Sequence, residues 1–173
     1  KRGAHTLRVP PWTRMNKQAL LLVLLIAIAG MAVAAGLAGY FARGNDPGEL
    51  PAPHPDMRIV SLAPAVTETL FAIGAGGQVV GRTEYCDYPE AAQKLPTVGT
   101  TLTPNYEAMM RLKPSLIVGE ATKDAPVSEL NQIAPTKLLP WLTLDDTLAG
   151  IRELGRLCGR AEAAEKIASE MES

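Results

Sequence analysis

Histidine is almost absent from this sequence. Its two histidines, His5 and His54, both precede Met57, where regular apolar patterning begins. A Ser/His or Cys/His catalytic pair is therefore missing from residues 57–173. The sequence also contains no GxGxxG, GxxxxGK(S/T), HExxH or GxSxG motif, so the common signatures of nucleotide binding and of hydrolysis are missing. These absences argue against an enzyme, and we predict neither a cofactor nor a metal site.

Cysteine and basic residues are also scarce in residues 57–173. Cys86 and Cys158 are the only cysteines, and their spacing matches neither a metal pair nor a redox motif. We expect two unpaired thiols, although the spacing leaves a disulfide open in an oxidising compartment. With 11 basic and 15 acidic residues, the region lacks the positive footprint of nucleic-acid binding, and we predict no nucleic-acid partner.

An uncharged apolar run occupies residues 19–41. As a helix it would span roughly 35 Å at about 1.5 Å per residue, which is enough to cross a bilayer. The basic leader, residues 1–18, predicts that the amino terminus is cytoplasmic. Ala32-Val33-Ala34 also fits a cleavage site, so the run is either a transmembrane anchor or a signal peptide. Both alternatives place the remainder of the chain in the periplasm, anchored to the inner membrane by residues 19–41 if the run is retained.

A proline-rich linker at residues 42–56 precedes alternating strand and helix patterns. Pro64 suits the first turn of a helix that Gly74 ends, between two short apolar runs. We therefore predict an α/β fold, a Rossmann-like lobe with a parallel sheet flanked by helices, preceded by one amino-terminal transmembrane or signal helix. Strands are expected at 58–62, 79–81, 116–118 and 137–139, an extended segment at 97–101, and helices at 64–73, 91–94, 106–112, 127–133, 144–157 and 161–171.

Several loops follow strands of this predicted sheet and therefore share one edge, where open α/β sheets bind their ligands. These loops carry hydroxyl, carboxylate and aromatic groups, which are suited to holding a ligand without reacting with it. The candidate ligand-binding residues are Ser61, Tyr85, Thr100, Thr101, Glu120 and Trp141.

Three motifs in order, RIVSLAPAVTETLFAIGAG, VVGRTEYCDYPEAAQKLPTVGT and PNYEAMMRLKPSLIVG, make the chain resemble one family. They are similar to the amino-terminal lobe of the periplasmic binding proteins that serve ABC importers of cobalamin, haem and iron-siderophores. In that family one long rigid helix joins two α/β lobes, and the ligand lies between them. The resemblance implies an amino-terminal lobe at 57–160 and the start of the interlobe helix at 161–173, with the second lobe absent from this sequence.

The resemblance also assigns roles to particular residues. Tyr85 matches the tyrosine that contacts corrin in the cobalamin binders. Glu107 matches an acid that docks against arginines of the membrane permease. Thr101 and Glu120 stand where cobalamin binders carry tryptophans, so two stacking faces are missing, and Trp141 in a neighbouring loop is a candidate replacement. Tyr85 is alternatively a ligand to ferric iron, which prefers phenolate and carboxylate oxygens.

We therefore expect the solute-binding component of an ABC importer, which captures cobalamin or a ferric chelate and delivers it to the permease of the inner membrane. An alternative is a membrane-tethered extracytoplasmic sensor or interaction domain without a transport role. An exported enzyme on a Rossmann-like lobe is a third, and it would need a catalytic carboxylate pair such as Glu68 and Glu120. Since one lobe offers half a cleft, the chain alone is expected to bind weakly.

Overall fold

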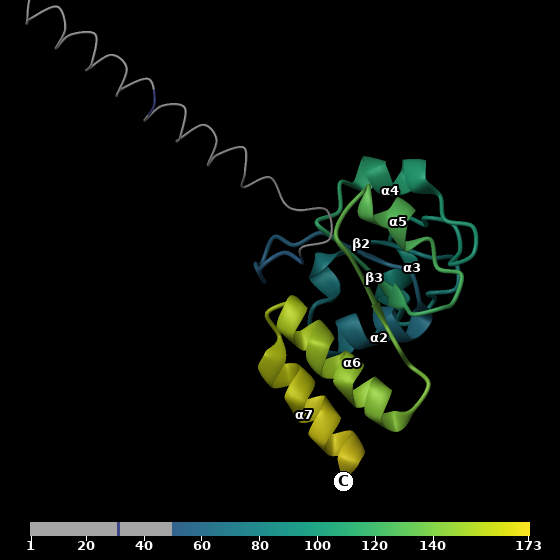
Figure 1. Cartoon of the computed structure of the whole chain (residues 1–173). Coiled ribbons are helices and arrows are strands. Elements are labelled where there is room, and N and C mark those ends of the chain that lie inside the picture. Colours follow the sequence, from purple (N-terminus) through teal and green to yellow (C-terminus); the bar gives the residue numbers. More distant parts are fainter. Residues whose placement is uncertain (1–30, 32–49) are drawn as a thin grey trace, which may run out of the picture. The chain divides into compact units, whose positions relative to one another are not determined.

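The computed structural model describes Met31 and residues 50–173. Four parallel strands form one sheet in the order β2-β1-β3-β4, with helices on both faces (Figure 1). The strands are β1 (Ile59–Ser61), β2 (Val79–Arg82), β3 (Leu116–Glu120) and β4 (Thr136–Leu139). The α-helices are α2 (Pro64–Ala72), α3 (Glu90–Gln93), α4 (Tyr106–Leu112), α5 (Val127–Asn131), α6 (Leu144–Leu157) and α7 (Ala161–Glu172), and η2 (Gly76–Gln78) is a 3-10 turn. This architecture confirms the predicted α/β fold.

Local sequence signals account for where these helices begin. Pro64 is the first residue of α2. The Asn105 side chain accepts a 2.9 Å hydrogen bond from the backbone N–H of Ala108 and caps α4. Thr143 and Asp146 form a reciprocal capping box at the start of α6. The largest differences from prediction are that β3 continues to Glu120 and that α5 ends at Asn131.

Successive residues of the central strands point to opposite faces and build two cores. On one face Ile59 and Val118 pack with α2, α6 and α7, and on the other Val60 and Ile117 pack with α4 and α5. Figure 1 shows this division, with α2, α6 and α7 on one side of the sheet and α4 and α5 on the other. All four of these strand residues are fully buried. The sheet therefore presents its strand ends, rather than its faces, to solvent.

The winding of the sheet reverses at β1. The chain passes from β1 through α2 to β2 on one side, then returns across β1 to β3 and continues to β4. The connecting helices change face at the same point, because α2 packs in one core and α4 in the other. The carboxyl ends of β1 and β3 therefore flank a topological switch point, where open α/β sheets bind ligands.

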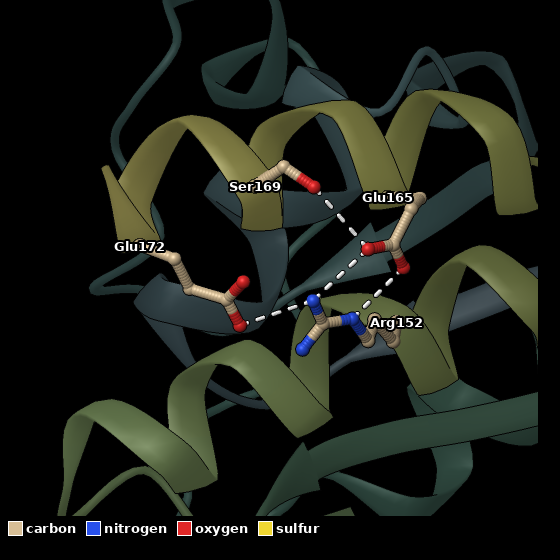
Figure 2. Close-up of polar contacts among 4 residues, drawn as sticks. All are labelled: Arg152, Glu165, Ser169 and Glu172. Carbon is tan, nitrogen blue, oxygen red and sulfur yellow. Dashed lines mark hydrogen bonds and ion pairs between the residues drawn. The ribbon is translucent and has the colours of Figure 1, made fainter.

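Helices α6 and α7 form a tightly joined antiparallel pair. A Cβ atom built on Gly155 of α6 would lie 2.3 Å from Cβ of Ala164 in α7, so only glycine permits this approach. Arg152 reinforces the contact: its Nε lies 2.8 Å from Glu165 and its Nη2 lies 3.1 Å from Glu172 (Figure 2). The Arg152 guanidinium lowers the pKa of Glu165. These contacts fix the direction in which α7 runs along the lobe.

The expected linker packs against the lobe over its described part. Leu50 is half-buried and contacts the core, while Pro53 lies near Gly159, 3.6 Å from where a Cβ on that glycine would be. Core contacts outside residues 57–173 are thus made by Leu50, while residues 52–56 are exposed. Within Met31 and residues 50–173 no helix is long and apolar enough to cross a bilayer. Apart from Met31, the expected anchor at 19–41 lies outside the described residues.

Candidate ligand-binding site

Backbone hydrogen bonds join the loops at the carboxyl edge of the sheet. The N–H of Leu62, just after β1, donates to the carbonyl of Val118 in β3 at 2.8 Å. The N–H of Thr83, just after β2, donates to the carbonyl of Ser61 at 3.2 Å, and that of Ala121 donates to Leu139 at 2.8 Å. The starts of the loops that follow β1, β2 and β3 are thereby held to neighbouring strands of the sheet. They form one continuous edge over the switch point.

A buried arginine holds the loop after β2 in place. Arg82 is 8% exposed, and its guanidinium donates only to backbone carbonyls, those of Ala92 at 2.8 Å, Thr83 at 2.9 Å, Gln93 at 3.2 Å and Glu84 at 3.3 Å. The planar fork of donors suits this arrangement. Arg82 therefore holds the start of this loop, at Thr83 and Glu84, to the end of α3, at Ala92 and Gln93. Sequence reasoning did not identify it, because an arginine at the end of a strand gives no sign of being buried.

Tyr85 lies on this supported loop, with its side chain 66% exposed. The neighbouring residues are fixed: Thr83 is fully buried, and its hydroxyl lies 3.1 Å from the thiol of Cys86, which is 1% exposed. The N–H of Glu84 donates to the carbonyl of Gly99 at 3.0 Å. A rigid backbone thus presents an exposed phenol ring, as the sequence predicts for a ligand contact.

The loop of residues 99–104 supplies the two predicted threonines. Gly99 has φ of +82°, and a Cβ there would lie 2.5 Å from the carbonyl oxygen of Thr103, so the turn requires glycine. Thr101 donates its hydroxyl to the carbonyl of Leu62 at 2.7 Å, directly at the end of β1. The hydroxyl of Thr100 lies 2.8 Å from that of Thr103. Both predicted hydroxyls therefore have partners that shape the loop, and Thr101 ties it to the switch point.

Two aliphatic side chains that the sequence analysis missed are the most exposed large apolar groups of this edge. Leu102 is 83% exposed and Leu142 is 85% exposed. They follow Thr101 and Trp141, on the loops beyond β2 and β4, and Glu120 is half-buried at the end of β3. Isolated exposed leucines are common on protein surfaces, but these share an edge with Tyr85. The edge therefore combines the Tyr85 ring, two aliphatic groups and the carboxylates of Glu84 and Glu120.

Two predicted residues lie away from this surface. Ser61 is fully buried, and its hydroxyl accepts a 2.8 Å hydrogen bond from Thr67, so it is an interior residue. Trp141 packs against Gly150 of α6, since a Cβ on that glycine would lie 3.1 Å from its Cη2 atom. Trp141 lines a separate hollow of about 410 Å³ beside α2, α6 and α7. The sequence placed Ser61 and Trp141 at strand ends by their position in the chain. It did not determine the direction in which their side chains point.

Glu107 is exposed in the first turn of α4, which begins at the same edge after the residue 99–104 loop. Its carboxylate pairs with Arg111 one turn later at 2.7 Å. Both side chains are mostly solvated, so this pair is weak and leaves Glu107 able to exchange partners. Its position is therefore compatible with the docking role that the resemblance implies.

Within residues 50–173, titratable groups do not gather into a reactive cluster. No group of three histidine, cysteine, aspartate or glutamate side chains converges there. Cys86 and Cys158 are both buried and unpaired, as expected. Burial raises the pKa of Cys158 to about 11, which keeps its thiol protonated near neutral pH.

A four-stranded parallel sheet with helices on both faces and a switch point between β1 and β3 defines an open α/β lobe. Residues 59–173 match the periplasmic binding protein family, and the chain belongs to that family. A vitamin B12-binding protein of Pectobacterium carotovorum is 36% identical over 118 residues, which are 66% of this chain and 43% of that relative. The resemblance inferred from the three motifs is thus confirmed.

Solved structures show the same lobe. The periplasmic vitamin B12-binding protein BtuF of Vibrio cholerae aligns with a TM-score of 0.61 at 33% identity, covering 69% of this chain and 48% of that one. The periplasmic heme-binding protein RhuT of Roseiflexus sp. RS-1 aligns with a TM-score of 0.57 at 32% identity, covering 68% and 46%. The chain thus spans less than half the length of these relatives.

Proposed function

We propose that this chain forms the amino-terminal lobe of a periplasmic solute-binding component of an ABC importer, which captures cobalamin or a ferric chelate, such as a siderophore or haem, and delivers it to the permease. The observation that carries the proposal is the exposure of Tyr85, Leu102 and Leu142 on loops at the carboxyl edge of the sheet, whose inner strands β1 and β3 flank the switch point. Such a surface suits a large, partly apolar ligand that it contacts without enclosing.

Tyr85 is the central contact in this proposal. Its ring is exposed while the backbone beneath it is fixed by Arg82 and by the hydrogen bond from Glu84 to Gly99. A preorganised ring stacks on a flat macrocycle with little loss of conformational entropy. Its phenol oxygen also provides a hard ligand for ferric iron, as does the carboxylate of Glu120.

The chain's departures from the cobalamin binders set the range of ligands. Thr101 is committed to the carbonyl of Leu62, and Glu120 carries a charge, so neither provides a stacking face. Leu102 and Leu142 provide apolar contact in their place. We therefore keep haem and ferric siderophores beside cobalamin as candidate ligands. Glu107 is the proposed contact to the permease: Glu107→Ala should leave ligand affinity unchanged while weakening binding of the loaded protein to the permease.

Equilibrium dialysis of the full chain against cyanocobalamin, haemin and a ferric hydroxamate siderophore tests this proposal, since all three absorb visible light. One class should bind saturably. Tyr85→Ala should weaken it about five- to twentyfold, because a lost stacking contact costs about 1–2 kcal/mol. Tyr88→Ala is the matched control, since Tyr88 is also 66% exposed but lines the hollow beside α2.

Three outcomes would count against the proposal. The first is no saturable binding up to about 1 mM ligand by a folded protein, because even half of a cleft with this contact area should bind in that range. The second is equal weakening by Tyr85→Ala and Tyr88→Ala, which would place the ligand elsewhere. The third is Glu107→Ala reducing ligand affinity while leaving permease binding intact, which would remove its docking role.

A further inference from the structure

The hollow of about 410 Å³ beside α2 has no role in the proposed function. It lies among α2, α6 and α7 and the loops that carry Tyr88 and Trp141. Its lining is mostly apolar and includes Ile151, Ile167 and Met171. The volume is within the range of small-molecule sites, roughly 300–1,000 Å³. The hollow is therefore large enough to hold a compact organic ligand.

The charge of the hollow comes from a single residue. Glu68 is the only charged side chain in its lining, and no lysine, arginine or histidine lines it. Within residues 50–173 the Glu68 carboxylate takes part in none of the ion pairs or side-chain hydrogen bonds. The hollow therefore presents one unneutralised negative charge beside an apolar surface.

The two threonines of the lining are already engaged in hydrogen bonds. Thr69 donates its hydroxyl to the carbonyl of Ala65 at 2.7 Å, one turn earlier in α2. Thr147 donates in the same way to the carbonyl of Thr143 at 2.9 Å. These threonines thus present mainly their methyl groups to a ligand. Glu68, the Tyr88 hydroxyl and the Trp141 Nε1–H, which is buried and has no hydrogen-bond partner, are left to recognise a polar group.

Two aromatic residues line the same hollow as Glu68. Tyr88 is 66% exposed, and Trp141 is held against α6 by its contact with Gly150. Aromatic faces attract cations through the ring quadrupole, and an adjacent carboxylate adds to that attraction. A second hollow of about 300 Å³ shares Glu68 and Tyr88 and adds Phe71. The aromatic and acidic surface therefore extends on both sides of Glu68.

We propose that this hollow binds a small organic cation, an ammonium group attached to an aromatic or alicyclic body. The ammonium group pairs with Glu68, and the apolar body occupies the space beside Tyr88, Trp141 and Ile167. An anion is disfavoured because no basic side chain lines the hollow. The proposal does not depend on the solute-binding function, since none of these residues belongs to the exposed group of Tyr85, Leu102 and Leu142.

Fluorescence of Trp141 reports on this site directly. In a full-length Trp12→Phe variant Trp141 is the only tryptophan, because the chain has two. The variant is titrated with phenethylammonium, with neutral 2-phenylethanol and with anionic 3-phenylpropionate, which share a phenyl group and similar size. Phenethylammonium should change the fluorescence saturably. The neutral alcohol should bind about fivefold more weakly, because a solvated ion pair contributes about 1 kcal/mol.

Substitution of the carboxylate separates charge recognition from apolar contact. Glu68→Gln should bring the affinity for phenethylammonium down to that for 2-phenylethanol, whereas Glu84→Gln, an exposed acid outside the hollow, should not change it. Circular dichroism confirms that each variant is folded. Equal binding of the three probes, an unchanged affinity in Glu68→Gln or no fluorescence response would overturn the proposal. Self-association that is lost in Tyr88→Ala would assign the hollow to a second copy and also overturn it.

Discussion

Replacing Gly155 by alanine tests whether the packing of α6 on α7 is as close as the structure shows. The added Cβ would lie 2.3 Å from the Ala164 Cβ and 3.1 Å from the carbonyl oxygen of Arg160. Two carbon atoms in contact need about 3.5–4.0 Å, so the helices must separate by more than 1 Å. Overpacking of this kind costs about 1–3 kcal/mol, and the better helix propensity of alanine returns about 1 kcal/mol. We expect a net loss of up to about 2 kcal/mol, and a loss of about 1–3 kcal/mol relative to a glycine-to-alanine change that gains the same propensity without the clash.

Urea unfolding of the full chain, followed by far-ultraviolet circular dichroism, measures this loss. Gly150→Ala is the matched control, because Gly150 is also buried in α6 and gains the same helix propensity. There the new Cβ meets only the end of the Trp141 side chain, at 3.1 Å, which can shift. Gly150→Ala should be neutral or slightly stabilising. A Gly155→Ala variant as stable as the Gly150→Ala variant would refute the close crossing.

Three further perturbations test other parts of the structure. Arg82→Met should weaken ligand binding, measured by dialysis, and lower the free energy of unfolding in urea by about 2–4 kcal/mol, because four carbonyls lose their donors. An unchanged affinity and an unchanged free energy of unfolding would exclude a positioning role for Arg82. A hydrogen bond from Arg156 lowers the pKa of Glu153, and partial burial opposes this effect. The net result is a pKa below the ordinary value of 4.5. The stability it contributes is present above pH 4.5 and lost as the pH falls through the lowered value, so Glu153→Gln should flatten the acid limb of a stability profile. A thiol reagent should label Cys86 and Cys158 slowly until the chain unfolds, because both are buried and burial raises the pKa of Cys158 to about 11; rapid labelling of the native chain would contradict this.

Local patterns predicted the fold because its elements are short and clearly punctuated. Pro64 and Thr143 mark helix starts that the structure confirms. The order of the strands in the sheet could not be predicted from local patterns. The pairing of β1 with both β2 and β3 depends on packing between distant segments. The switch point that locates the candidate edge therefore came from the structure.

The candidate site was predicted only in part for a similar reason. Loop position placed Tyr85 and Thr101 at the carboxyl edge, and their contact with a ligand stays a prediction; it also selected Ser61, whose side chain is fully buried. Burial of Arg82 and exposure of Leu142 run against the usual preferences of arginine and leucine. Such exceptions depend on tertiary contacts that no local pattern encodes.

Hydrogen exchange of the full chain, with and without cyanocobalamin, haemin or a ferric siderophore, tests the central claim most directly. Binding at the carboxyl edge should slow exchange in residues 83–87, 99–103, 120–126 and 142–143, which carry Tyr85, Leu102, Glu120 and Leu142. Residues 65–72 and 147–171, which border the separate hollow, should change little. Protection confined to that hollow, or no protection by any of the three ligands, would contradict the assignment of this edge as the solute-binding surface.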